Sequence, residues 1–137
     1  MLMSMREYKE RYMPNECNAA TVIRNYNEYF RDNAAIGDGV TVHFYTDAHA
    51  YTIIRRTAKT LTLRRCKATL DPNFKPNFIP GGFAGHVTNQ SEQRYTYDED
   101  ENGSVRRANW SEKKHGFYVG RELSVSPGRH EFYDYNF

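Results

Sequence analysis

The chain has 137 residues, which fits one domain, and 39% of its side chains are hydrophobic, enough for a packed core. Its net charge of +2 is too small to indicate a general nucleic-acid binder, and its two cysteines lack the spacing of a disulfide framework or a zinc site. The sequence contains no run of about 18 apolar residues and no apolar core of signal-peptide length, so we expect no membrane contact and a cytoplasmic location.

Residues 1–36 are predicted to form a helical arm. Between residues 18 and 33 the apolar side chains recur at three- and four-residue spacing, which places them on one face of a helix. Asn15 and Asn18 are candidate N-caps, and a shorter helix is expected over residues 5–12. The one-sided apolar face suits either a lid on the core of the same chain or an oligomerisation helix, and both interpretations stay open.

Residues 37–137 are predicted to form a β-barrel-like domain that makes one globular unit with the arm. After Gly37-Asp38-Gly39 the apolar spacing changes from a helical period to two, because Val40, Val42 and Phe44 alternate with more polar residues. This alternation is typical of a half-buried strand.

A β-hairpin is expected next, with strands over residues 51–56 and 60–66, which are rich in Thr, Ile and Leu. One face of this hairpin should point Ile53, Leu61 and Leu63 into the core. The alternation then leaves several of its arginines displayed on the surface.

Residues 68–93 are predicted to form a long loop, because this segment holds three of the chain's five prolines, and its three phenylalanines argue against disorder. Alternation resumes over residues 93–98. Asn102-Gly103 is a type I′ hairpin signal, with residues 105–110 as the returning strand, and a last strand is expected over residues 130–137.

Short antiparallel strands joined by tight turns are typical of a small barrel. The predicted fold class is therefore mainly β (α+β), with an antiparallel SH3-like barrel, an N-terminal helical arm and a long Pro/Gly-rich loop.

Neither a metal site nor a catalytic motif is evident. The five histidines show no HxH or HxxxH spacing with a nearby carboxylate, although His43, His49 and Asp47 could converge across a strand and a turn. GxSxG, P-loop and GxGxxG motifs are missing from the sequence, so we expect no cofactor. An enzyme, such as a phosphodiesterase that uses His43, His49 or His86, is the least favoured interpretation because no set of acid, base and nucleophile is recognisable.

Arginine, aromatic and carboxamide side chains make up the candidate binding site. Residues 51–67 contain six basic side chains and no acidic one, whereas residues 98–101 are all acidic. Arginine forms a planar fork for phosphate, aromatic rings stack on bases, and Asn or Gln reads base edges. The alternative is a solvated sheet face whose arginines pair with the acidic run. The predicted ligand-binding residues are Arg55, Arg56, Arg64, Arg65, Tyr51, Trp110, Asn89 and Gln90.

The chain also resembles a widespread family of small bacteriophage proteins, through the string GDGVTVHFYTDAHAYTIIRRTAKTLTLRRCKATLDPNFKPNFIPGGFAGHVTNQ followed by YTYDEDENGS, WSEKK and GRHEFYDYNF. The similarity spans residues 37–137 and carries no catalytic signature. Proteins similar to these include anti-CBASS sponges, which bind cyclic dinucleotide immune signals such as 3′3′-cGAMP without cleaving them.

The resemblance implies an immune-evasion protein of the host cytoplasm that binds a cyclic dinucleotide and is not an enzyme. A two-fold ligand also suits a homo-oligomer, either a dimer or a tetramer, because a two-fold interface offers each half of the ligand the same residues. The alternative function is a small nucleic-acid-binding β-barrel that uses the same basic hairpin, for which strong salt dependence is the expected sign.

Overall fold

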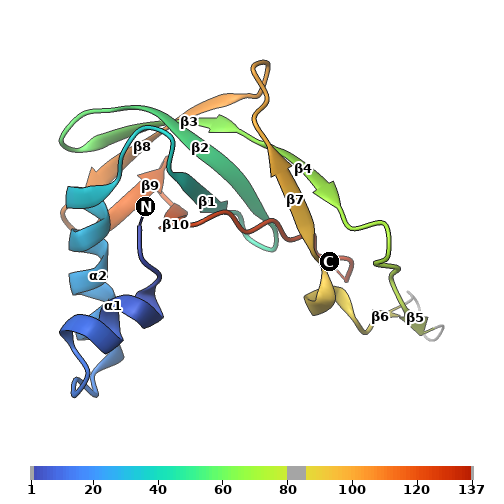
Figure 1. The fold of residues 1–137 in the computed structure, drawn as a ribbon, viewed down its shortest axis with the longest axis horizontal. Coiled ribbons are helices and arrows are strands. Elements are labelled where there is room, and N and C mark those ends of the chain that lie inside the picture. Colours follow the sequence, from blue (N-terminus) through green and yellow to red (C-terminus); the bar gives the residue numbers. More distant parts are fainter. Residues whose placement is uncertain (1, 80–85, 137) are drawn as a thin grey trace.

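The structure is a computed structural model that describes residues 2–79 and 86–136. Two helices precede a set of short strands, and the chain is arched, with the helices at one end and a smaller lobe at the other (Figure 1). In chain order the elements are α1 (Met5–Tyr12), α2 (Ala19–Asn33), β1 (Gly39–His43), β2 (Ala48–Arg56), β3 (Thr60–Arg65), β4 (Lys67–Leu70), β5 (Phe78–Ile79), β6 (His86–Val87), the 3-10 turn η1 (Gln90–Glu92), β7 (Tyr95–Asp98), β8 (Val105–Ser111), β9 (Gly116–Val119) and β10 (Leu123–Pro127).

Six strands close into an antiparallel barrel in the order β1-β10-β9-β8-β3-β2. This confirms the predicted mainly β (α+β) class, with a small barrel and an N-terminal helical arm. Alternate residues of each strand point inward and exclude water from one core. The buried side chains of that core come from both the arm and the barrel: Phe30, Ala34, Val40, Val42, Tyr51, Ile53, Leu61, Leu63, Ala108, Trp110, Phe117, Val119 and Val125.

The predicted hairpin is present as β2 and β3. Ile53, Leu61 and Leu63 are all 0% exposed, as the alternation predicts. The pairing slips between Ile53 and Arg55, which marks a β-bulge that changes the register toward the end of β2. Strands β9 and β10 are not predicted by the sequence pattern, because each contributes only a few alternating residues.

A smaller lobe is built largely from the segment predicted as a long loop. Strand β4 pairs with β7, and β5 pairs with β6, so part of this segment is regular; residues 80–85 lie outside the described residues. The predicted Asn102-Gly103 hairpin is wrong, because β7 pairs with β4 whereas β8 pairs with β3 and β9. A glycine is nevertheless needed at 103, since a Cβ there would collide with the Arg65 carbonyl oxygen.

The predicted strand over residues 130–137 is also wrong. The described part of this segment forms a tail joined to the sheet by one bridge, between Phe132 and Ala48. Side-chain hydrogen bonds hold the remainder: Gln93 accepts from the Tyr133 N–H at 3.0 Å, and Asn136 bonds both backbone groups of Val87. The tail therefore ties the smaller lobe to the barrel.

The two helices form as predicted, and Asn18, rather than Asn15, is the N-cap of α2. Helix α2 packs on the barrel through Phe30, whose ring meets Phe117 edge-on at 5.4 Å. Helix α1 has no buried residue and rests on α2 through a group of tyrosine rings around Tyr8. The lid interpretation therefore fits α2, whereas the aromatic contacts of α1 within the described part of the chain are with the arm itself.

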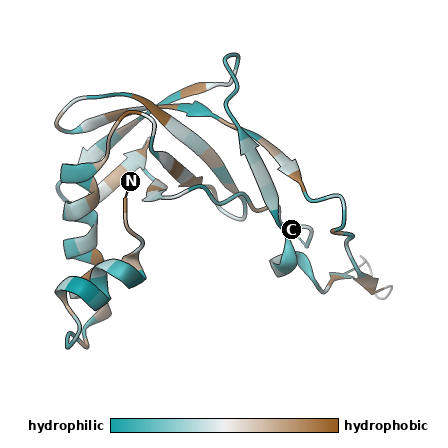
Figure 2. Cartoon of the chain, in the orientation of Figure 1, coloured by the Kyte–Doolittle hydropathy of each residue, from teal (hydrophilic) through white to brown (hydrophobic). Residues whose placement is uncertain are grey.

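Figure 2 shows α1 and the outer side of α2 as mainly hydrophilic, with hydrophobic stretches along the barrel strands. Within the described part of the chain, neither helix has the length and apolarity needed to cross a membrane.

Candidate functional site

The arginines of the β2–β3 hairpin do not form one cluster. Arg55 is exposed on the outer face of the sheet. Arg56 turns toward the end of α2 and donates to the carbonyl oxygens of Ala34 at 2.6 Å and Ala58 at 3.2 Å. Arg56 therefore closes the arm onto the barrel, which is a structural role.

Arg65 is paired with a carboxylate of the C-terminal tail. Its two terminal nitrogens donate to Glu131 at 2.8 and 2.7 Å, and Glu131 also accepts from the Ala50 N–H at 2.9 Å. The side chains of Arg65 and Glu131 are only 24% and 10% exposed. This two-pronged pair occupies the guanidinium fork, so the prediction that Arg65 contacts a ligand phosphate does not fit the structure.

The two predicted stacking residues are buried, although Trp110 borders a hollow of about 320 Å³ next to Tyr118. Tyr51 is 1% exposed because it points into the barrel core. Trp110 is 8% exposed, packs edge-on against Phe117 at 5.3 Å and has the Arg31 guanidinium 4.8 Å from its ring centroid. A strand position does not reveal which face of the sheet carries the side chain, and here the ring faces are covered.

Asn89 and Gln90 lie in the smaller lobe, where their side chains bond backbone groups. The Asn89 amide accepts from the Asn77 N–H at 2.8 Å and donates to the Lys75 carbonyl at 2.9 Å, and Gln90 accepts from the Tyr135 N–H at 2.9 Å. Both carboxamides hold the loop in shape. The eight predicted residues are therefore not brought together.

Arg64 alone of the predicted residues belongs to a cluster of opposed charges next to a hollow. Glu99, from the predicted acidic run, accepts from Arg64 at 3.3 Å and from Arg129 at 3.1 Å. Two guanidinium groups thus share one carboxylate, and the three side chains together keep a charge of +1. This pairing between the hairpin and the acidic run is what the alternative interpretation of the arginines expects.

The register of the sheet explains why these side chains meet. Gly39 of β1, Thr52 of β2 and Arg64 of β3 are successive cross-strand partners and so share the outer face. Gly39 has no side chain, and the stem of Arg129 occupies that space, since a Cβ on Gly39 would lie 2.6 Å from the Arg129 Cγ. Arg129 is thereby laid across the sheet toward Glu99.

Thr52 is the hub of the cluster. Its hydroxyl donates to Glu99 at 2.7 Å, accepts from Arg129 at 2.8 Å and lies 3.2 Å from the Cys66 sulfur. The hydrogen bond from Thr52 and the Arg64 guanidinium lower the pKa of the Glu99 carboxyl below its ordinary value, against the opposing effect of burial. Glu99 is therefore ionised at neutral pH and fixed in position.

A hollow of about 440 Å³ opens beside this cluster, and we call it the Arg129 pocket. Gly128 forms part of its wall with φ of +86°, a left-handed conformation that glycine adopts without strain. Tyr97 also lines the pocket, and its hydroxyl oxygen accepts a hydrogen bond from the Glu131 N–H at 2.8 Å. The pocket is lined by Leu2, Gly37, Asp38, Gly39, Tyr97, Gly128 and Arg129.

Of the two arginines, Arg129 lines the pocket, and its side chain is 29% exposed. The Nε atoms of Arg64 and Arg129 are buried and have no hydrogen-bond partner within the described residues. Because both Nε atoms are buried, an anion in the pocket would contact the exposed part of the Arg129 guanidinium and not these two atoms. Asp38 adds an acceptor to the same pocket, with one oxygen held by the Ala35 N–H at 2.9 Å. The pocket can therefore hold an anion and a hydrogen-bond donor side by side.

The predicted ligand-binding residues did not include Arg129, Tyr97 or Asp38. Arg129 stands in the C-terminal string GRHEFYDYNF that carries the phage-protein resemblance, and Asp38 stands between two glycines at the start of the first strand. Glycine–charge–glycine at a strand start is the local signal that could have pointed to a close backbone approach.

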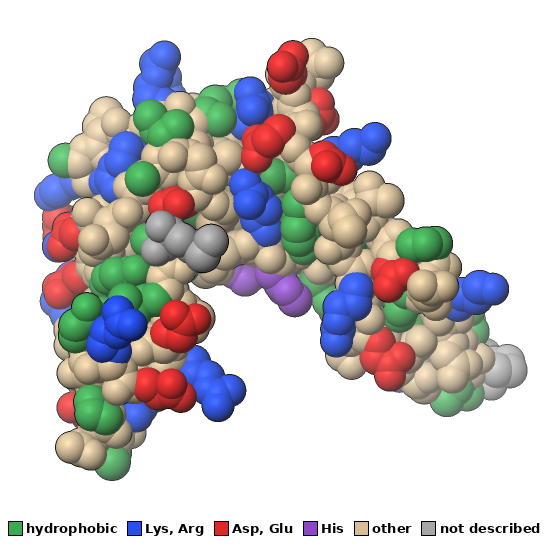
Figure 3. Space-filling model, in the orientation of Figure 1, with side chains coloured by type: hydrophobic (Ala, Val, Ile, Leu, Met, Phe, Trp, Pro, Cys, Tyr) green, Lys and Arg blue, Asp and Glu red, His purple; other side chains and the backbone are tan. Residues whose placement is uncertain are grey.

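The suspected histidine cluster is divided among separate contacts. His43 bonds the Ser126 hydroxyl at 2.7 Å, the His49 ring packs on Phe44 at 4.7 Å, and Asp47 accepts from the Asp134 N–H at 2.8 Å. The described ranges contain no group of three His, Cys, Asp or Glu side chains able to hold a metal ion. Figure 3 shows histidine on the concave side of the arch, between the helical arm and the smaller lobe.

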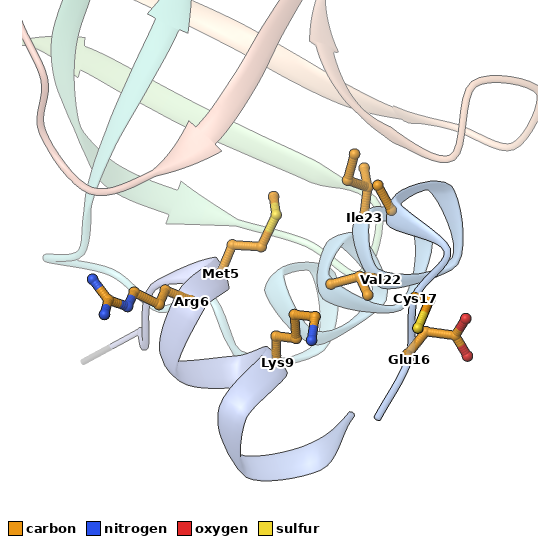
Figure 4. Close-up of a pocket in the computed structure, with 8 residues that line it drawn as sticks. Met5, Arg6, Lys9, Glu16, Cys17, Val22 and Ile23 are labelled. Atoms are coloured by element: carbon orange, nitrogen blue, oxygen red, sulfur yellow. The ribbon is translucent and has the colours of Figure 1, made fainter. Parts of the chain in front are cut away.

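The helical arm carries a second hollow, of about 430 Å³, between α1 and α2 (Figure 4). Met5 of α1 and Ile23 of α2 line this hollow, and their exposed fractions of 39% and 44% are high for apolar side chains. Arg6 and Lys9 stand at the same hollow. Its apolar character suits a protein contact better than a nucleotide.

No protein-family model matches this sequence, and comparisons with curated proteins and with solved structures found no match either. We therefore assign the site from its own residues and geometry.

Proposed function

We propose that this chain is a phage-encoded immune-evasion protein that binds and sequesters a cyclic dinucleotide, such as 3′3′-cGAMP, without cleaving it, and that the Arg129 pocket is the binding site. The observation that carries the proposal is Arg129, a guanidinium that lines the hollow, is 29% exposed, and is held in place by Thr52 and by Glu99, which it shares with Arg64. The phage-protein resemblance supports the immune role, and a cytoplasmic location follows because the ligand is an intracellular signal.

A nucleotide suits this pocket better than a free anion. Arg129 supplies charge and donors for a phosphate, but Asp38 would repel an isolated anion. A guanine or adenine base brings N–H donors that Asp38 can accept and a flat face that Tyr97 can stack against. The combination of cation, carboxylate and aromatic ring thus favours a phosphate joined to a purine.

Binding without turnover fits the same geometry. Pockets for small ligands start at about 300 Å³, so a hollow of about 440 Å³ suits one half of a cyclic dinucleotide better than the whole. A second copy related by a two-fold axis would receive the other half. A sponge acts stoichiometrically and needs slow release, which preorganised contacts such as the fixed Arg129 side chain favour.

The apolar hollow between α1 and α2 is the surface that we propose to be buried between copies. The hollow carries charges of both signs, with Arg6 and Lys9 on α1 and Glu16 just before α2, so two copies of this surface can be complementary. Placing a charge in the hollow with Ile23→Glu should convert the oligomer to monomer in sedimentation-equilibrium experiments. A wild-type chain that is monomeric at all concentrations contradicts this part of the proposal.

The proposal is tested by incubating the protein with a panel of cyclic and linear nucleotides, removing free ligand by gel filtration, and analysing what heat denaturation releases. Intact cyclic dinucleotide, recovered in stoichiometric amount, is the expected result. Recovery of a cleaved product would identify an enzyme instead, and a protein that retains none of the nucleotides would refute the assignment.

A further inference from the structure

The outer face of strands β2, β3, β8 and β9 carries a second set of nucleic-acid-compatible side chains, away from the Arg129 pocket. Leu61, Leu63 and Ala108 are 0% exposed, so the residues that alternate with them face outward. The register places two outer rows side by side, with partners on one face. One row is Arg55, Thr62 and Arg107, and the other is Thr60, Asn109 and Tyr118.

The cations of this face are not neutralised by neighbouring acids. Arg55 and Arg107 stand on strands separated by β3, and Lys114 and Arg121 follow at the adjoining turns. The salt bridges of the described residues include none of these four side chains. Such a basic surface is the electrostatic footprint of phosphate-backbone binding.

Tyr118 provides a stacking surface at the end of the polar row. It borders a hollow of about 320 Å³ that Asn109, Lys114 and Arg121 also line. Lys114 lies over the Tyr118 ring, 4.7 Å from its centroid, and donates to the Arg121 carbonyl. A base that takes the place of the ammonium group would stack on the ring and free Lys114 for a phosphate.

Asn109 is oriented to read a base edge. Asn109 is exposed, and its carbonyl oxygen accepts from the Thr60 hydroxyl at 3.0 Å, whereas its amide N–H donors make no hydrogen bond within the described residues. An amide held in this way offers donors to a base edge that presents acceptors, so the face combines backbone attraction with one point of base contact.

We propose that the outer face of β2, β3, β8 and β9 binds single-stranded nucleic acid, with Arg55 and Arg107 on phosphates and Tyr118 stacked on a base. A single strand is the fitting partner because its bases are free to stack, whereas a duplex groove needs a helix or a ribbon that this convex face does not present. This site does not depend on the cyclic dinucleotide proposal, since no residue is shared with the Arg129 pocket.

The test is fluorescence anisotropy with labelled oligouridylate and oligothymidylate of about 12 nucleotides, within the site sizes of such platforms. Tyr118→Ala should weaken binding by about tenfold or more, whereas Tyr118→Phe keeps the ring and should bind like the wild type. Arg107→Ala should weaken binding and lower the slope of log affinity against log salt by about one. Arg24→Ala, an exposed arginine on α2, is the matched control and should change nothing.

Three results would overturn the assignment. One is wild-type protein that fails to bind either oligonucleotide at low salt. Another is unchanged affinity in both Tyr118→Ala and Arg107→Ala. The last is duplex binding as tight as single-strand binding, because stacking then contributes nothing. Arg129→Ala should leave oligonucleotide binding intact, which separates failure of this site from failure of the Arg129 pocket.

Discussion

Replacing Glu131 by alanine should destabilise the fold by about 3 kcal/mol. Removing one partner of a buried ion pair costs about 3–5 kcal/mol, and because the Arg65 side chain is 24% exposed, the lower end applies. The substitution also leaves the Ala50 N–H without its acceptor, a loss of about 1–3 kcal/mol that overlaps with the first. Glu131→Gln keeps an acceptor oxygen and should cost roughly half as much.

Urea denaturation at neutral pH, followed by the fluorescence of Trp110, measures this effect, because the chain's single tryptophan lies in the core. Glu92→Ala is the control; this exposed carboxylate belongs to no salt bridge of the described residues and should change stability by less than about 0.5 kcal/mol. If Glu131→Ala costs less than about 1 kcal/mol, the pair behaves as a solvated surface pair. Arg65 would then be free for an external anion after all.

Three further perturbations test other parts of the fold. Gly103→Ala should destabilise by about 1–3 kcal/mol in the same urea assay, because its Cβ meets the Arg65 carbonyl; unchanged stability would mean that the two segments are not in contact. Burial and the nearby His130 lower the pKa of His43 from its ordinary value of 6.5. The unfolded state therefore binds the proton more readily than the folded state, and the free energy of unfolding should fall as the pH drops below 6.5. His43→Gln should make stability depend less on pH in this range. The pKa of Glu99 is lowered in the folded state, so this carboxylate adds stability that is fully present above pH 4.5 and is lost as the pH falls through its folded pKa. Glu99→Gln should therefore remove this loss of stability at acidic pH.

The local elements could be predicted because their signals are local. The three- and four-residue apolar spacing of α2 and the Asn18 cap lie within a few turns of chain, and the inward positions Ile53, Leu61 and Leu63 follow from alternation. The pairing of strands, in contrast, depends on residues far apart in the sequence. Asn102-Gly103 has the composition of a hairpin turn, yet its flanking strands pair elsewhere, which the turn residues alone do not encode.

The candidate site could be predicted only in part, because an arginine's availability depends on distant residues. Arg65 is occupied by Glu131, which lies 66 residues away in sequence, and Arg64 reaches Glu99, 35 residues away. The basic composition of the hairpin was a real signal for charge on the sheet. It did not distinguish the paired arginines from Arg55, which forms no salt bridge within the described residues.

Buried aromatic residues misled the prediction for a related reason. Tyr51 and Trp110 lie on strands whose two faces look equally suitable in sequence, and the closed barrel places both rings inward or under the arm. Tyr97, which lines the Arg129 pocket, has the same residue type as Tyr51 and the same strand setting. Closure of the barrel, a property of the whole chain, decides between them.

The most direct test of the central proposal is a calorimetric titration of 3′3′-cGAMP into the wild-type chain, Arg129→Ala and the control Arg24→Ala. Truncating one side of a buried charge contact typically costs at least about 2 kcal/mol, so we expect Arg129→Ala to bind about 30-fold more weakly or worse, with Arg24→Ala unchanged. Equal affinity in all three proteins, with each of them folded, would show that the Arg129 pocket is not the site of nucleotide binding.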